Sequence, residues 1–334
     1  MKRPVKTILS LSVTVLLLLA AILWQLSTGD IHLGIGETLR AVFNLAPDQT
    51  AWFVVWQLRM PHLLAAVITG GALAISGMIL QTLTRNPLAD SSILGINAGA
   101  SLGAVLLIGA SSVYHFHYSD NGLALVVLLG ALLSALLVFF VNRQGSATRV
   151  LLGGVALTSV LNGIILLIQL QLNQFDFEEA LIWLSGSFWD TDMGFLMRYF
   201  WLYLVLLVLT LFAMRLLSGL TLGQEMALAI GVNVKSAQRL LMLLAIGLTT
   251  VAVSVGGAIS FVGLMAPNIA RRLVGARPRF QLPLSWLLGT LIMVVADVIA
   301  NNGFGKVTLP VGLIVAMITM PYFIYLLFFQ KRKS

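Results

Sequence analysis

Ten long apolar runs dominate this 334-residue sequence, in which only 10% of the residues are charged. A soluble domain has about 25% charged residues, so these side chains could not cover a water-facing surface of this length. A bilayer core has no water to bind backbone amides, and long apolar runs there must be helices. The runs cover about residues 7–26, 61–84, 93–110, 122–141, 150–172, 195–217, 239–257, 260–274, 283–300 and 309–329.

These runs predict an all-α polytopic membrane protein that forms a single domain over residues 1–334, with about ten membrane-spanning helices. The run at 260–274 is short and contains Pro267, so a half-length or re-entrant helix is expected there. The first run follows a basic start, as in a signal peptide. It lacks a small-x-small cleavage site, however, and a retained helix is expected.

The basic residues predict the orientation, because Lys and Arg collect on the cytoplasmic side of membrane proteins. With the amino terminus inside and ten crossings, sixteen of the twenty Lys and Arg residues lie on the cytoplasmic face. Both termini are then cytoplasmic, as is the loop at 218–238. The net charge of +8 is therefore a topology signal rather than a sign of nucleic-acid binding.

The sequence contains no motif typical of an enzyme, a metal site or a nucleotide-binding site. There is no cysteine, no complete metal-binding pattern, and no phosphate-binding loop or hydrolase motif, so we expect no enzyme activity, metal or cofactor. Asp297 is the only acidic residue within a predicted span, and it lies near the outer end of that span. An ion-coupled secondary transporter needs a titratable group near the membrane midplane, and it is the weaker alternative. If the chain transports a solute, the energy should come from another subunit.

Three sequence blocks carry a resemblance to a known family. The first contains Gly71, Gly77 and the turn Arg85-Asn86-Pro87-Leu88-Ala89, the second is 222–232, and the third runs from Gly257 to Gly312. In this order they resemble the FecCD-type permeases of ABC importers, a family of iron–siderophore, haem and cobalamin permeases. The match extends from about residue 55 to the carboxyl terminus.

The resemblance implies the type II ABC importer permease architecture and a multi-pass protein of the bacterial cell membrane. It implies a second permease subunit, two copies of an ABC ATPase on the cytoplasmic side, and an extracytoplasmic substrate-binding protein. The transported substrate would be a ferric siderophore, with haem or cobalamin as the alternative. Whether the permease pair is a homodimer or a heterodimer stays open.

Two cytoplasmic sites follow from the resemblance. The turn Asn86, Pro87 and Leu88, together with Ala147 and Thr148, would close the cytoplasmic end of the pathway, although an ordinary helix-ending turn explains the residues equally well. The block at 222–232 would be the coupling helix that docks on the ATPase, with Ala227, Leu228 and Ile230 on one face. Its predicted coupling residues are Gly223, Gln224, Glu225, Ala227, Leu228, Gly231 and Val232.

A third site, on the outer face, would receive the binding protein through basic residues. The family pattern Arg-Leu-Pro-Arg is Arg59-Met60-Pro61-His62 here, and Asn301 stands where the family has another arginine. Lys306 lies close by in the sequence and could replace the lost charge. The predicted docking residues are therefore Arg59, His62, Asn301 and Lys306. The departures fit either a heterodimer whose partner has the full arginine set or a homodimer with weakened docking.

Overall fold

The computed structural model describes residues 3–29, 31–45, 49–92, 95–141, 147–188, 191–304 and 308–329, and every regular element in these ranges is a helix. The helices are α1 (Arg3–Ser27), α2 (Ile35–Val42), α3 (Gln49–Phe53), the π-helix η1 (Val54–Arg59), α4 (Met60–Thr84), α5 (Ile96–Tyr114), α6 (Asp120–Val141), α7 (Ala147–Gln169), α8 (Gln174–Ser185), α9 (Met193–Phe212), α10 (Met214–Thr221), α11 (Gln224–Ala229), α12 (Val234–Gly256), α13 (Val262–Val274), α14 (Pro278–Asn302) and α15 (Val311–Phe329).

Each predicted apolar run overlaps one or two of these helices, and the all-α class is confirmed. Among the described residues, eight helices are long and apolar enough to cross a bilayer. The described apolar part of α15 is shorter, and α13 has only 13 residues. At 1.5 Å per residue α13 spans roughly 20 Å, less than the thickness of a bilayer core of about 30 Å. A half-length helix was expected at this position, whereas the total of ten crossings stays a prediction.

The structure also contains short helices that hydrophobic runs could not indicate. Helices α2, α3, α8, α10 and α11 are each 12 residues or fewer. The run predicted at 195–217 is divided between α9 and α10, which meet at Ala213. The run predicted at 93–110 begins as a helix only at Ile96, after Gly95 with a φ of +79°. Left-handed backbone at such a residue separates the preceding loop from the helix.

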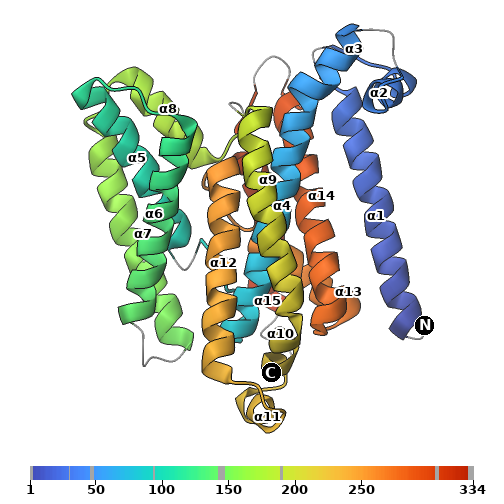
Figure 1. The fold of residues 1–334 in the computed structure, drawn as a ribbon, viewed down its shortest axis with the longest axis vertical. Helices are drawn as coiled ribbons and strands as arrows, with labels where there is room; N and C mark the ends of the chain where they lie inside the picture. The colour runs from blue at the N-terminus through green and yellow to red at the C-terminus, as the bar shows by residue number, and fades with distance from the viewer. Residues whose placement is uncertain are drawn as a thin grey trace.

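Helix α4 lies at the centre of the molecule, between α12 and α14, whereas α5, α6 and α7 form a group at one side and α1 lies at the other (Figure 1). The start of α1 and the short helix α11 lie toward the same end of the molecule (Figure 1). Nearly all of α4 is buried. A central helix needs small residues because its neighbours approach on every side.

Glycines set the closest approaches of α4. A methyl group on Gly77 would lie 1.9 Å from the carbonyl oxygen of Gly263 in α13, and one on Gly70 would lie 2.4 Å from that of Gly289 in α14. Helices α5 and α6 use the same device, because Gly99 and Gly130 face each other's backbone. The small residues of the sequence therefore mark direct backbone contacts between helices.

Candidate functional sites at the two ends of the molecule

The predicted gate turn begins where α4 ends. Arg85 caps α4 with a left-handed backbone, at a φ of +52°. The Asn86 side chain then accepts a hydrogen bond from the Leu88 N–H at 2.9 Å, and the Asn86 carbonyl accepts one from the Ala89 N–H at 3.1 Å. This is an Asx turn, which explains why an Asn-Pro sequence follows the helix.

Two side chains attach this turn to α13. The Asn268 amide donates to the Pro87 carbonyl at 2.6 Å. Asp90, which is 2% exposed, accepts hydrogen bonds from the Ser92 hydroxyl at 2.8 Å and from the Phe261 N–H at 3.3 Å. Phe261 is the N-cap residue of α13, so the carboxylate lies at the positive end of the helix dipole. The sequence analysis missed Asp90, although it directly follows the Arg85–Ala89 turn.

A third side chain compensates for the proline inside α13. Pro267 has no N–H, and the Gly263 carbonyl one turn earlier therefore lacks its helical donor. The Gln81 amide of α4 donates to this carbonyl at 3.2 Å and to the Leu264 carbonyl at 3.3 Å. Helix α13 is thus held by α4 and by the gate turn along its first half.

For the other two predicted gate residues, the structure gives the backbone but not the side chains. Ala147 and Thr148 form the first turn of α7, and their side chains lie outside the described part of the structure. The gate assignment therefore stays a prediction for all five residues, Asn86, Pro87, Leu88, Ala147 and Thr148.

The predicted coupling segment contains the expected short helix, α11, between α10 and α12. Gly223 precedes it with a φ of +104° and Gly231 follows it with a φ of +82°. A methyl group on either glycine would meet nothing within 4 Å. Both positions therefore need glycine for their backbone conformation, not for space. The Val232 N–H closes the end of the helix by donating to the Ala227 carbonyl at 2.9 Å.

The expected common face of Ala227, Leu228 and Ile230 is wrong. Ala227 is fully buried, whereas Leu228 is 61% and Ile230 is 56% exposed. Ala227 and Leu228 are consecutive and point about 100° apart on the helix, and Ile230 lies beyond the last residue of α11. Gln224 and Glu225 are exposed as well, and α11 stands at the extreme end of the molecule (Figure 1). The outward side of α11 therefore carries uncovered apolar side chains, Met226 and Leu228, beside the polar Gln224 and Glu225.

At the other end of the molecule, a buried carboxylate gathers two of the predicted docking residues. Asp297 of α14 is 1% exposed and accepts hydrogen bonds from the amides of Gln25 at 2.5 Å and Asn301 at 3.0 Å. The His62 ring nitrogen Nδ1 lies 3.4 Å from the same carboxylate. These contacts join α1, α4 and α14, so His62 and Asn301 face into the protein.

Arg59 also turns inward. Its side chain is at the end of η1, is 8% exposed, and donates to the backbone carbonyls of Leu26 and Ile31. It thereby fixes the end of α1 and the loop that follows. The fourth predicted docking residue, Lys306, lies outside the described residues. The docking assignment stays a prediction, and three of its residues have structural contacts that the sequence did not indicate.

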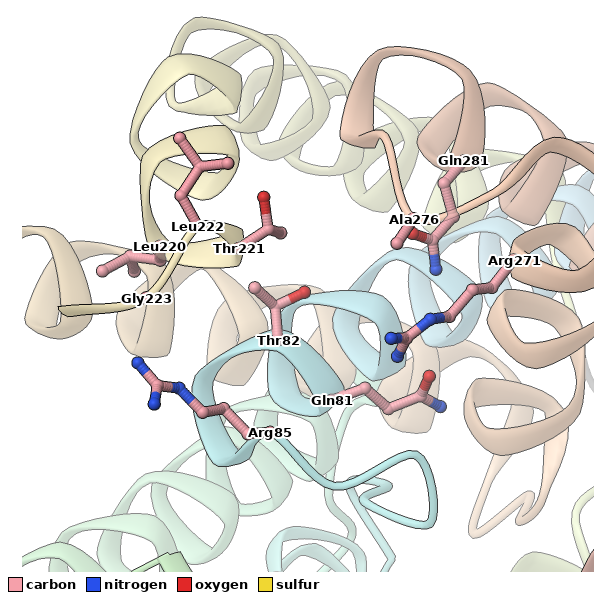
Figure 2. A pocket seen from close by; sticks show the side chains of 10 residues that line it. All are labelled: Gln81, Thr82, Arg85, Leu220, Thr221, Leu222, Gly223, Arg271, Ala276 and Gln281. Atoms are coloured by element: carbon pink, nitrogen blue, oxygen red, sulfur yellow. The ribbon is translucent and has the colours of Figure 1, made fainter. Parts of the chain in front are cut away.

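Next to the gate turn, a cavity of about 300 Å³ opens between α4, the loop after α10, and the connection from α13 to α14 (Figure 2). Arg85 lines it from the end of α4 and Arg271 from the last turn of α13. Gln81 of α4 also lines the cavity and donates to the Gly263 carbonyl of α13. Within the part of the chain that the structure describes, no group of three or more metal-ligating residues comes together. The two ends therefore offer contacts and cavities, and the described residues hold no metal centre.

Comparison with known proteins identifies the family. The sequence profile of the FecCD transport family matches residues 17–329. The chain belongs to the FecCD transport family. The iron(3+)-hydroxamate import system permease protein FhuG of Bacillus subtilis is 33% identical over 328 residues, covering 96% of this chain and 97% of that protein. The family resemblance of the three sequence blocks is confirmed.

Two further likenesses bear on the fold and on the range of relatives. The hemin transport system permease protein HmuU of Yersinia pestis is 31% identical over 311 residues, covering 92% of this chain and 93% of that protein. A solved metal-chelate type ABC transporter in an inward-facing conformation matches with a TM-score of 0.82 and 28% identity, over 95% of this chain and 98% of that chain. This FecCD protein is therefore an integral membrane protein with the fold of an ABC transporter permease.

Proposed function

We propose that this FecCD protein is the permease subunit of an ABC importer that carries ferric siderophores across the cell membrane. The observation that carries the proposal is the family match over residues 17–329, joined to a hydroxamate permease relative of nearly equal length. Haem is the second candidate substrate, because a hemin permease matches over almost the same length. The ion-coupled alternative loses its support, since the family consists of ABC permeases.

Two copies of an ABC ATPase would bind the cytoplasmic end of a pair of permease subunits. The uncovered apolar residues Met226, Leu228 and Ile230 of α11 support this docking site, because a short apolar helix fits a groove on a partner protein. ATP binding and hydrolysis on the partners would then shift the permease between outward-open and inward-open states. The chain itself performs no chemistry in this scheme.

The gate and the ATPase site lie close together in the chain's cytoplasmic end. Asn86, Pro87 and Leu88 are attached to α13 through Asn268 and Asp90, so a displacement of α13 would move the turn as well. Ala147 and Thr148 would meet the turn from α7 or from the second permease subunit. A movement of α11 would reach the turn through α10, which contacts both α11 and α4.

The binding protein would dock on the opposite end. There Arg59, His62 and Asn301 support docking indirectly, by holding α1, α4 and α14 in one arrangement. Direct ion pairs with the binding protein would then fall to Lys306, whose charge the sequence supplies, and to the second permease subunit.

Reconstitution in proteoliposomes tests the function. The chain, purified with the ATPase and permease partners that co-purify from its own membranes, should accumulate 55Fe-labelled ferric hydroxamate when ATP and the binding protein are supplied. Competition by excess hemin would assign the pathway to haem instead. Uphill accumulation by the chain alone, with no ATPase present, would contradict the proposal.

A further inference from the structure

The cavity beside the gate turn has an unusual lining. Its polar residues are Gln81, Thr82, Arg85, Thr221, Arg271 and Gln281, and the remaining lining is aliphatic or glycine. None of the described lining residues is acidic. Figure 2 shows these side chains around one space, with Arg85 and Arg271 on opposite sides of it. The cavity therefore carries positive charge that its own walls do not neutralise.

The two arginines have no acidic partner among the described residues. Neither Arg85 nor Arg271 makes an ion pair with a carboxylate in the described part of the chain, and both are exposed. Arg272, the next residue of α13, differs because its guanidinium lies 5.7 Å from the ring of Tyr322 and 5.2 Å from that of Tyr325. The Arg272 guanidinium thus packs against α15, whereas the Arg271 guanidinium can donate hydrogen bonds into the cavity.

The neutral polar side chains already donate hydrogen bonds to backbone carbonyls. Gln81 donates to the carbonyls of Gly263 and Leu264, Thr82 to Met78, Thr221 to Ser218, and Gln281 to Pro267. What these side chains offer to a ligand is therefore mainly acceptor oxygens. The Gln81 oxygen Oε1 has almost no accessible surface, so the acceptor oxygens that the lining offers are those of Thr82, Thr221 and Gln281. A ligand that satisfies this cavity needs anionic oxygens for the arginines and hydroxyl donors for the oxygens of Thr221 and Gln281.

We propose that the cavity binds a phosphoglycerol group, in which a phosphate carries a glycerol with free hydroxyls. The planar guanidinium fork matches phosphate oxygens and forms charge-assisted hydrogen bonds with them. The glycerol hydroxyls donate to the Thr221 hydroxyl oxygen and to the Gln281 amide oxygen. The cavity lies at the arginine-rich ends of the helices, where lipid headgroups lie, and basic pockets at this level bind anionic headgroups. Phosphatidylglycerol is the membrane source of this group, and glycerol 3-phosphate is a soluble source.

The position of the site suggests what an occupant would do. Gly223, which also lines the cavity, is the N-cap residue of α11. A bound headgroup would therefore brace the backbone from which α11 projects and link it to α4 and α13. The site goes beyond the transport function and does not depend on the identity of the transported solute.

Thermal denaturation of the purified full-length chain in a neutral detergent tests the site. Titration with short-chain phosphatidylglycerol should raise the melting temperature with saturation, and phosphatidylcholine should not. Loss of a charge-assisted bond in Arg271→Gln or Arg85→Gln should weaken the apparent affinity about tenfold or more. The matched control is Arg272→Gln, which should keep the affinity because Arg272 faces the tyrosines instead of the cavity.

Native mass spectrometry of the unmodified chain gives a measurement that needs no variant. Phosphatidylglycerol should stay bound at activation energies that remove phosphatidylcholine. Glycerol 3-phosphate binding as tightly as phosphatidylglycerol would identify the soluble compound as the ligand. The cavity would still be a phosphoglycerol site. Equal binding of the two lipids, or unchanged affinity in Arg271→Gln, would overturn the proposal. So would loss of ATPase binding without loss of lipid binding in that variant, because the cavity would then receive an acidic side chain.

Discussion

Among the described residues, charged and polar side chains pair with one another or with the backbone at one end of the molecule, whereas two arginines have no acidic partner at the other end. At the end predicted to face outward, here called the outer end, His62 and Asn301 contact Asp297, and Arg59 is bonded to backbone carbonyls. At the inner end, Arg85 and Arg271 have no acidic partner among the described residues, and the apolar side of α11 is uncovered.

This difference separates residues that hold the fold from residues that await a partner. A buried polar group left unpaired costs about 1–3 kcal/mol, so the outer contacts are stability contacts. An exposed, unpaired arginine or leucine contributes little to stability in the isolated chain. Substitutions at the outer end should therefore reduce the amount of folded protein, whereas substitutions on the inner surface should act on binding.

The largest expected effect lies between these ends, where α4 touches α13. In Gly77→Ala, the new methyl group would overlap the Gly263 carbonyl, which belongs to backbone and cannot rotate away. Overpacking typically costs about 1–3 kcal/mol, and the backbone contact places this variant at the upper end of that range. Fluorescence-detected size-exclusion chromatography should show loss of the folded peak.

The matched control is Gly163→Ala in α7, where the methyl group meets nothing within 4 Å. It should leave the folded peak unchanged or raise the melting temperature slightly, because alanine favours the helix. Equal behaviour of the two variants would mean that α4 and α13 are not in backbone contact.

The second effect tests the outer end. Asp297→Ala would leave the amides of Gln25 and Asn301 without their acceptor and should cost about 2 kcal/mol, measured by thermal denaturation. Asp297→Asn keeps one acceptor oxygen and should lose less. Glu178→Gln, at an exposed position of α8, should change stability by less than about 0.5 kcal/mol. If Asp297→Ala matched this control, the outer end would be as loosely held as the inner surface.

A smaller effect is expected at the gate turn. Asn268→Ala removes the bond to the Pro87 carbonyl and should cost about 1 kcal/mol. Its control is Asn302→Ala, where the amide donates only within its own helix, to Val298. That control should change the melting temperature less. The comparison measures the attachment of the turn to α13, since both variants delete the same chemical group.

The sequence predicted what depends on local composition. The apolar runs, the short helix at Pro267 and the helix at 224–229 were all expected, because each follows from residue types close together in the chain. The family was recognisable for the same reason. The exposed and buried sides of α11 were not, since a six-residue helix is too short for its periodicity to indicate which face packs inward.

Contacts between distant residues could not be predicted from the sequence. Gln81 and Gly263 are 182 residues apart, and His62 and Asp297 are 235 residues apart. His62 looked like a weakened docking residue because only its departure from the family pattern was visible. Its partner became visible once α4 and α14 were placed side by side. The partners of Arg59 could not be predicted either, because they are backbone carbonyls that no residue type indicates.

The smallest effect on stability is expected on the outward face of α11, and there the effect on binding should be largest. Leu228→Ser changes a residue that is 61% exposed, so the free energy of unfolding should change by less than about 0.5 kcal/mol. Burial of a leucine against a partner stabilises a complex by about 1.5–3 kcal/mol, so ATPase co-purification should weaken about tenfold or more. Glu225→Ala, on the same exposed helix, should reduce the transport obtained per ATP hydrolysed.

The control for Leu228→Ser is Leu243→Ser, at a leucine of α12 that is 58% exposed. Leu243 lies within a membrane-spanning helix, away from the ATPase surface, so its replacement should leave ATPase binding unchanged. If both variants co-purified with the ATPase equally well, α11 would be an interfacial helix without a docking role. The inner end would then differ from the outer end only in its arginines, and the cavity beside the gate turn would be the remaining binding site there.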